Sequence, residues 1–155
     1  MRAGCGAMRG TKDLRWLMVW VLCLLLGACA GGGVADTVSQ AVDESISAVE
    51  TARLAAAMDS SGQLTDAAAS TAVDDALMEL GQARTTVVQL SPGGEQDRDL
   101  RDAVLGVMDH CTSAMLAVAE ALASEDGRLS LADAQDQLQS AGATLSDLKN
   151  RLGGP

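Results

Sequence analysis

The chain has 155 residues, and its 11 basic and 21 acidic residues give it a formal net charge of −10 at pH 7. Such an acidic chain repels nucleic acid, so we expect no nucleic-acid partner. It contains two tryptophans and neither phenylalanine nor tyrosine, so stacking platforms for bases or sugars are scarce.

The N-terminal segment begins with a basic head and continues with the uncharged stretch 16–30, WLMVWVLCLLLGACA. This order is typical of a secretory signal, and a start at Met8 would only shorten the head. Fifteen residues of helix span about 22 Å, less than the roughly 30 Å hydrocarbon core of a membrane. A retained transmembrane anchor would have to include the glycines that follow, which form helices poorly, so we favour cleavage near Cys29.

Residues 26–29, LGAC, resemble the lipobox of bacterial lipoproteins. The resemblance covers about the first thirty residues and implies cleavage between Ala28 and Cys29. It also implies a diacylglycerol on the Cys29 thiol, which would anchor the protein to the cell membrane on its extracytoplasmic face. Two acyl chains hold a protein far better than one. The nine arginines against two lysines, with abundant alanine and glycine, resemble the composition of small actinobacterial lipoproteins.

The resemblance divides the chain into a signal peptide (1–28), a lipidated cysteine with a flexible glycine-rich tether (29–35), and a helical domain (36–155). Removal of 1–28 takes away four basic residues and one acidic residue, which leaves a net charge of −13 with His110 neutral. It also takes away both tryptophans, so the mature chain has no aromatic residue. Cys111 would be the only cysteine besides Cys29, so no internal disulfide is expected.

The domain shows helical periodicity in four segments, at about 36–59, 65–90, 96–124 and 130–152. Breakers separate them, the sharpest being SPGG at 91–94. The expected core positions are Val38, Val42, Ile46, Val49, Ala52 and Ala56 in the first; Val73, Leu77, Leu80, Ala83 and Val87 in the second; Leu100, Val104, Val107, Cys111, Ala114, Val118 and Ala121 in the third; and Leu131, Ala134, Leu138, Ala141, Leu145, Leu148 and Leu152 in the fourth.

These four segments predict an all-α fold, an antiparallel four-helix bundle with short links. Alanine in alternate seam layers would let the helix axes approach closely. The third segment, widened by Met108, Met115 and Leu122, should be the most buried helix. Thr37 and Gln40 would form a capping box in the first.

An internal repeat supports this architecture, because GQLT at 62–65 returns as GRLS at 127–130, 65 positions later. Two duplicated helical hairpins would explain it. In each link the glycine, Gly62 or Gly127, would close one helix in a left-handed conformation. Thr65 and Ser130 would then cap the next helix, with Leu64 and Leu129 as hydrophobic staples.

The same links, 62–65 and 127–130, resemble the back half of an EF-hand or dockerin calcium loop. Such a loop needs oxygen ligands at its first and twelfth positions. Here the first position would be Ala57 or Leu122, and the twelfth position of the first loop would be Ala68. We therefore favour a plain helix–turn–helix link, with no metal site and no cofactor.

Catalysis is not expected. His110 is the sole histidine, and the neighbouring Cys111 projects about 100° away around the helix, so the two cannot form a base and nucleophile pair. Cys111 lies on the apolar stripe as a small core residue. Met108 and Met115 would suit a soft partner surface or copper(I), but core filling is the simpler interpretation.

Two functions remain after these exclusions. The first is a non-catalytic binding or scaffolding module of the cell envelope, with an envelope protein as partner through helix-on-helix contacts. The second is a ligand- or cation-binding carrier whose bundle interior opens. A sealed interior favours the first, and a cavity lined by methionine and Cys111 favours the second.

Overall fold

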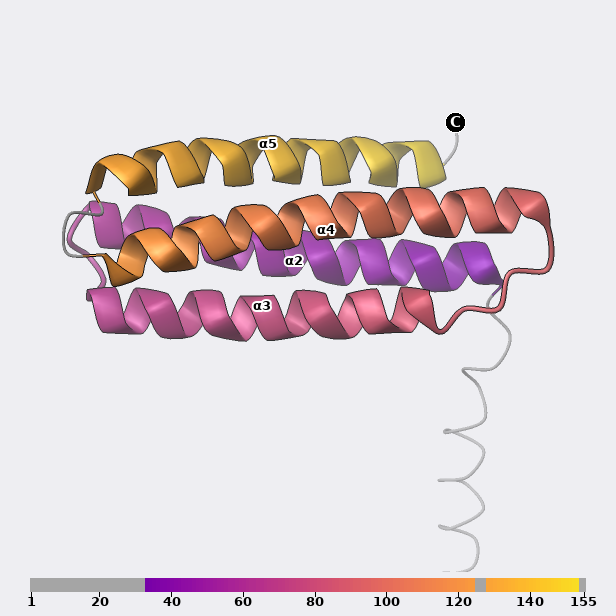
Figure 1. The fold of residues 1–155 in the computed structure, drawn as a ribbon, viewed down its shortest axis with the longest axis horizontal. Coiled ribbons are helices and arrows are strands. Elements are labelled where there is room, and N and C mark those ends of the chain that lie inside the picture. The colour runs from indigo at the N-terminus through magenta and orange to yellow at the C-terminus, as the bar shows by residue number, and fades with distance from the viewer. Residues whose placement is uncertain (1–32, 125–127, 154–155) are drawn as a thin grey trace, which may run out of the picture. The chain divides into compact units, whose positions relative to one another are not determined.

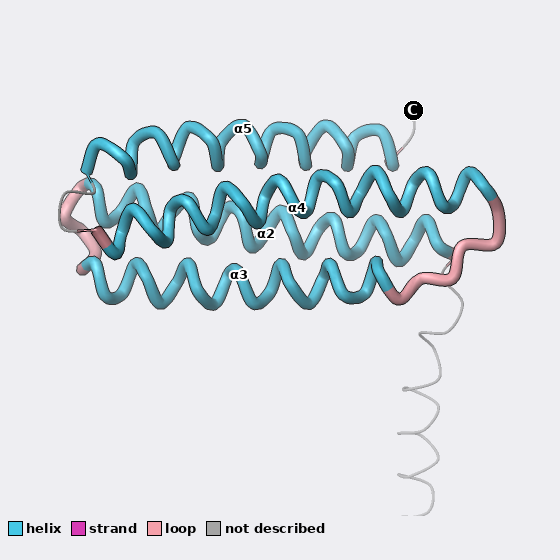
Figure 2. The backbone as a smooth tube through the Cα atoms, in the orientation of Figure 1, coloured by secondary structure: helices cyan, strands magenta, loops and turns pink. Residues whose placement is uncertain are grey.

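The computed structural model describes residues 33–124 and 128–153, which form four α-helices and no strand (Figures 1 and 2). The helices are α2 (Val34–Ser60), α3 (Asp66–Val88), α4 (Glu95–Ala123) and α5 (Arg128–Leu152). Each boundary lies within two residues of the predicted one. Val34 and Ala35, expected at the end of the tether, are the first residues of α2.

Consecutive helices run antiparallel, and the links 61–65 and 89–94 lie at opposite ends of the bundle (Figure 1). α2 packs against all three of the other helices, whereas within the described residues α3 and α5 do not contact each other. α2 and α4 therefore lie on the short diagonal of the bundle. The predicted antiparallel four-helix bundle is confirmed, and the duplication of two hairpins stays a prediction.

Buried residues in each helix recur with alternating spacings of four and three, which is the pattern of a coiled-coil seam. The seam residues are Val38, Val42, Ser45, Val49, Ala52 and Ala56 in α2; Ala69, Val73, Ala76, Leu80, Ala83 and Val87 in α3; Val104, Met108, Cys111, Met115, Val118 and Leu122 in α4; and Leu131, Ala134, Leu138, Ala141 and Leu145 in α5.

The seam departs from the predicted stripe in every helix: Leu148 and Leu152 of α5 are only half-buried, and α2 and α3 each place a smaller residue in the seam. Ile46 is only half-buried, and Ser45 takes the core position because it keeps the four-three spacing. The Ser45 hydroxyl donates to the Ala41 carbonyl at 2.7 Å, which satisfies the buried polar group. Leu77 is likewise half-buried, and Ala76 lies in the seam instead.

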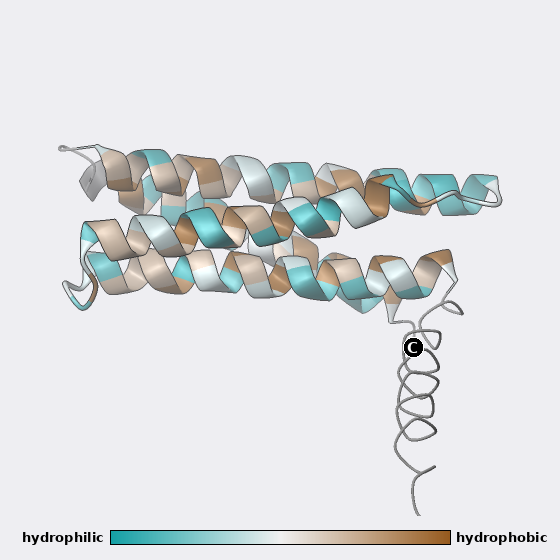
Figure 3. Cartoon of the chain, turned by 90° about the horizontal axis from the view of Figure 1, so that it is seen from below, coloured by the Kyte–Doolittle hydropathy of each residue, from teal (hydrophilic) through white to brown (hydrophobic). Residues whose placement is uncertain are grey.

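The prediction that the third helix is the most buried is wrong, because α2 holds that place. A second row of alanines on α2, Ala41, Ala48 and Ala55, is buried beside its seam. In α4 no residue before Val104 is buried, and Figure 1 shows the start of α4 extending past the other helices. Those first turns are almost wholly hydrophilic in Figure 3. Leu100 and Val107, expected in the core, are half-buried.

The first link has the predicted mechanism. Gly62 has a φ of +71°, in the left-handed region, where it closes α2. The backbone N–H of Gln63 donates to the Met58 carbonyl at 2.8 Å. The Thr65 hydroxyl then accepts from the backbone N–H of Ala68 at 3.3 Å, which caps α3.

Two other caps differ from the prediction. The N-cap of α2 is Gly33, so Thr37 lies one turn inside the helix, and its hydroxyl donates to the Gly33 carbonyl at 3.5 Å. The capping box of Thr37 and Gln40 is therefore wrong. α5 begins at Arg128, so Ser130 lies inside its first turn and is not the N-cap. Gly127 lies outside the described residues.

A core truncation tests this packing. Leu80 is fully buried, so Leu80→Ala should lower the free energy of unfolding by about 2 to 5 kcal/mol through lost burial and the cavity it leaves. Leu54 lies on α2 with 61% of its surface exposed, so Leu54→Ala should change that free energy by less than about 0.5 kcal/mol. Urea denaturation followed by circular dichroism measures both, and equal effects would contradict the assigned core.

Candidate functional site

The predicted site residues Ala28 and Cys29 lie outside the described residues. The described chain begins at Gly33, which is the N-cap of α2 and follows Cys29 by four positions. Any group attached at Cys29 would therefore be joined to the end of the bundle where α2 starts. That end also holds the 89–94 link and the end of α5 (Figure 1).

A carrier would need a cavity lined by methionine and Cys111. In this bundle those side chains instead fill the interior. Met108, Cys111 and Met115 are all fully buried in the seam of α4. The Cys111 thiol faces α5, with its Sγ 3.7 Å from the Ala141 carbonyl oxygen. Burial raises the pKa of the Cys111 thiol from near 9 to about 11. A thiol in this environment stays protonated at neutral pH and is a poor nucleophile or metal ligand.

His110 is exposed on the outside of α4, so it does not share the interior position of Cys111. Among residues 33–124 and 128–153, no group of three or more histidine, cysteine, aspartate or glutamate side chains is placed to hold a metal ion. The base and nucleophile pair considered from the sequence is therefore not assembled at His110 and Cys111, and residues 125–127 of the second candidate calcium loop lie outside the described residues.

Three hollows on the bundle surface are open to solvent and do not reach the buried methionines. The largest, about 720 Å³, lies at the end with the 61–65 link and is lined by Asp59, Ser61, Asp66, Ser124 and Gln135 among others. A second, about 410 Å³, lies between α4 and α5 and contains Ala117 and Gln137. A third, about 270 Å³, lies between α2 and α5.

Beside the third hollow, α5 approaches α2 closely, a contact that the sequence did not predict. A Cβ added at Gly142 would come within 3.3 Å of the Val49 Cγ1 atom, so this glycine lets α5 approach α2. Its signal in the sequence is a glycine inside an otherwise strongly helical segment, which usually has a packing reason.

Two exposed ion pairs join neighbouring helices. The Arg84 Nε lies 2.7 Å from the Asp109 Oδ1 atom and links α3 to α4. The Lys149 Nζ lies 2.7 Å from the Asp43 Oδ1 atom and links α5 to α2. Exposed pairs of this kind are screened by solvent and contribute little to stability.

Among the described residues, α4 alone is long and apolar enough to cross a membrane by length and composition. The buried helix of a globular bundle satisfies the same criterion, and α4 contributes a full seam to the core. The seam therefore accounts for the apolar composition of α4.

Comparisons of the chain with protein-family models, with curated proteins and with solved structures find no match. The features of the chain that bear on its function are therefore the segment around Cys29, the filled interior and the distribution of surface charge.

The environment of Cys111 predicts how stability changes with pH. Because burial raises the pKa of its thiol to about 11, ionisation above pH 9 favours the unfolded chain. The stability difference between wild type and Cys111→Ala should stay constant below pH 9 and shift against the wild type as the pH rises to 11. Urea titrations of both proteins at several pH values measure this, and a constant difference across that window would contradict the buried thiol.

Proposed function

We propose that the chain is a bacterial envelope lipoprotein, anchored by diacylglycerol on Cys29, whose helical bundle is a non-catalytic binding or scaffolding module. The observation that carries the proposal is the order of a basic head, an uncharged stretch and the residues LGAC at 26–29. The start of α2 at Val34 supports it, because a folded domain that begins directly after the cleavage site fits a protein divided at Cys29.

The interior of the bundle supports a module without catalysis. Its titratable thiol, Cys111, is buried and protonated, and its histidine, His110, is exposed on another side of α4. The hollows are surface features, and no group of three or more histidine, cysteine, aspartate or glutamate side chains among the described residues is placed to hold a metal ion. What such a bundle offers a partner is the outer surface of its helices, as in recognition of one helix by another.

The carrier alternative would require the interior to open. Full burial of Met108 and Met115 argues against it, since a site of the usual few hundred cubic ångströms would have to displace these side chains. The binding or scaffolding module is therefore the function that the described geometry favours.

Replacement of the anchor residue tests the proposal. Cys29→Ser should abolish lipid attachment, so the protein should lose the mass of the acyl groups and move from the membrane fraction to the soluble fraction. Mass spectrometry and detergent-phase partition of the protein from its native host, or from a related bacterium, measure both changes.

Cys111→Ala is the matched control, because it removes a cysteine from the bundle and leaves the LGAC segment intact. It should keep the mass of the acyl groups and the membrane location. An unchanged mass and location of Cys29→Ser would contradict the proposed anchor, together with the compartment that follows from it.

A further inference from the structure

We propose that the bundle stands upright on an anionic membrane surface, so that one end faces the lipid headgroups and the other points outward. The anchor pole is the end formed by the start of α2, the 89–94 link and the end of α5 (Figure 1). The outer pole is the opposite end, which holds the 61–65 link. The inference rests on the proposed anchor at Cys29 and adds an orientation to it.

The length of chain between Cys29 and α2 fixes where the bundle is attached. Val34 follows Cys29 by five positions, and an extended chain of that length reaches at most about 17 Å. The 27 residues of α2 extend about 40 Å, more than twice that reach. The anchor pole is therefore held near the membrane, while the outer pole is free to swing between the surface and the exterior.

Surface charge is distributed unequally between the two poles. The anchor half, residues 33–46, 80–113 and 146–153, contains nine acidic and five basic residues, a net charge of −4. The outer half, residues 47–79, 114–124 and 130–145, contains nine acidic residues and one basic residue, Arg53, a net charge of −8. The cross-helix ion pairs of Arg84 and Lys149 both belong to the anchor half.

An anionic surface acts on these halves over a short range, because the screening length at physiological ionic strength is about 8 Å. A bundle that lies on its side would bring the charge of both halves within that range. An upright bundle keeps the outer half more than about 20 Å away, beyond screening, so only the less negative half remains near the headgroups.

The sides of the bundle offer no compensating apolar face. The large apolar side chains that are exposed, Leu54, Met78, Val88 and Leu116, are spread over α2, α3 and α4. Scattered single residues of this kind do not form a membrane-binding surface. The 89–94 link at the anchor pole has no charged residue, and neither has the 61–65 link at the outer pole, so the charge difference between the poles lies in the helices.

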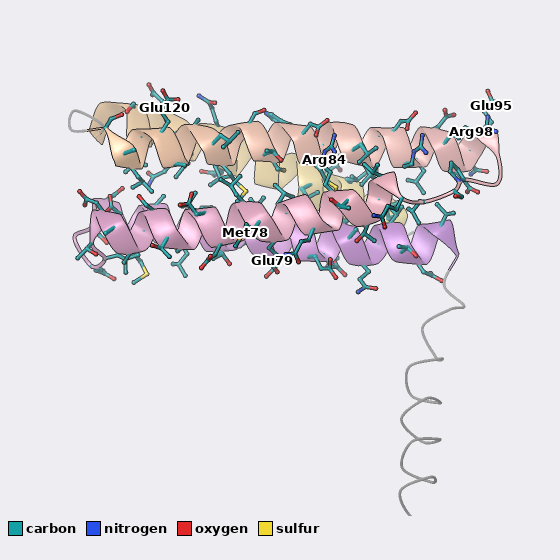
Figure 4. The ribbon with its side chains drawn as sticks, turned by 60° about the horizontal axis from the view of Figure 1, so that its bottom comes forward. Met78, Glu79, Arg84, Glu95, Arg98 and Glu120 are labelled. Atoms are coloured by element: carbon teal, nitrogen blue, oxygen red, sulfur yellow. The ribbon has the colours of Figure 1, made fainter. Side chains whose placement is uncertain are left out.

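Arg98 lies just beyond the 89–94 link, near the start of α4 and beside Glu95, while Glu120 lies toward the other end of the same helix (Figure 4). Arg98 is exposed and forms no ion pair with another described residue. Its guanidinium is therefore available to a lipid phosphate, the chemistry that arginine recognises best. The acidic Glu95 and Asp97 occupy the first turn of α4, where negative charge stabilises a helix N-terminus.

Depth-dependent quenching of the lipid-modified, full-length mature protein tests the orientation. Single cysteines for a fluorophore are placed at the poles, Ser91→Cys in the 89–94 link and Gln63→Cys in the 61–65 link, both in a Cys111→Ala background. The protein is reconstituted into vesicles of phosphatidylcholine and phosphatidylglycerol that carry a nitroxide on the lipid headgroup. Upright bundles should show quenching at position 91 at least threefold stronger than at position 63, and the ratio should fall in vesicles of phosphatidylcholine alone.

Flotation of the same vesicles separates the two proposals. Protein that does not float, and so behaves like a Cys29→Ser control, would overturn the anchor and the orientation together. Protein that floats with equal quenching at both positions would overturn the upright orientation and leave the anchor standing. A ratio that is the same in neutral and anionic vesicles would overturn the electrostatic cause proposed here.

Discussion

The fold depends on the small side chains that α2 presents to the other three helices. Ser45, Ala52 and Ala56 occupy half of its seam positions and valines the rest, and a second row of alanines is buried beside them. Because these side chains are short, α2 and α4 can approach across the diagonal of the bundle. The largest fully buried side chains belong to the other helices, among them Leu80, Met108 and Leu138.

This packing decides what the interior of the bundle contains. Aliphatic and thioether side chains make up the described core, and Met108, Cys111 and Met115 occupy the places that would line a cavity. In the described part of the chain, the burial that makes Cys111 a core residue also raises the pKa of its thiol. The outer surface is where a binding module of the proposed kind would meet its partner, and the charge of that surface is unequal from end to end.

Much of the fold could be predicted from the sequence, because four-three spacing and glycine or proline breakers act locally. Ser45 could not be predicted, since hydropathy ranks Ile46 above it and ignores the carbonyl of Ala41 that satisfies its hydroxyl. The sequence also did not predict that α2 is more buried than α4, because burial depends on how closely helices approach and not on how apolar each one is. Of the candidate site, the segment around Cys29 is a local pattern, whereas the charge difference between the poles requires knowing which helix ends meet.

The need for small side chains on α2 can be measured directly. The measurement compares the free energy of unfolding of Ala52→Leu with that of Ala57→Leu. Ala52 is fully buried in the seam and Ala57 is exposed on the same helix, so both variants add the same atoms to the same element. The account predicts that Ala52→Leu loses about 1 to 3 kcal/mol by forcing the helices apart, while Ala57→Leu stays within about 0.5 kcal/mol of wild type. Equal stability of the two variants would contradict it, since the space beside α2 would then not require a small side chain.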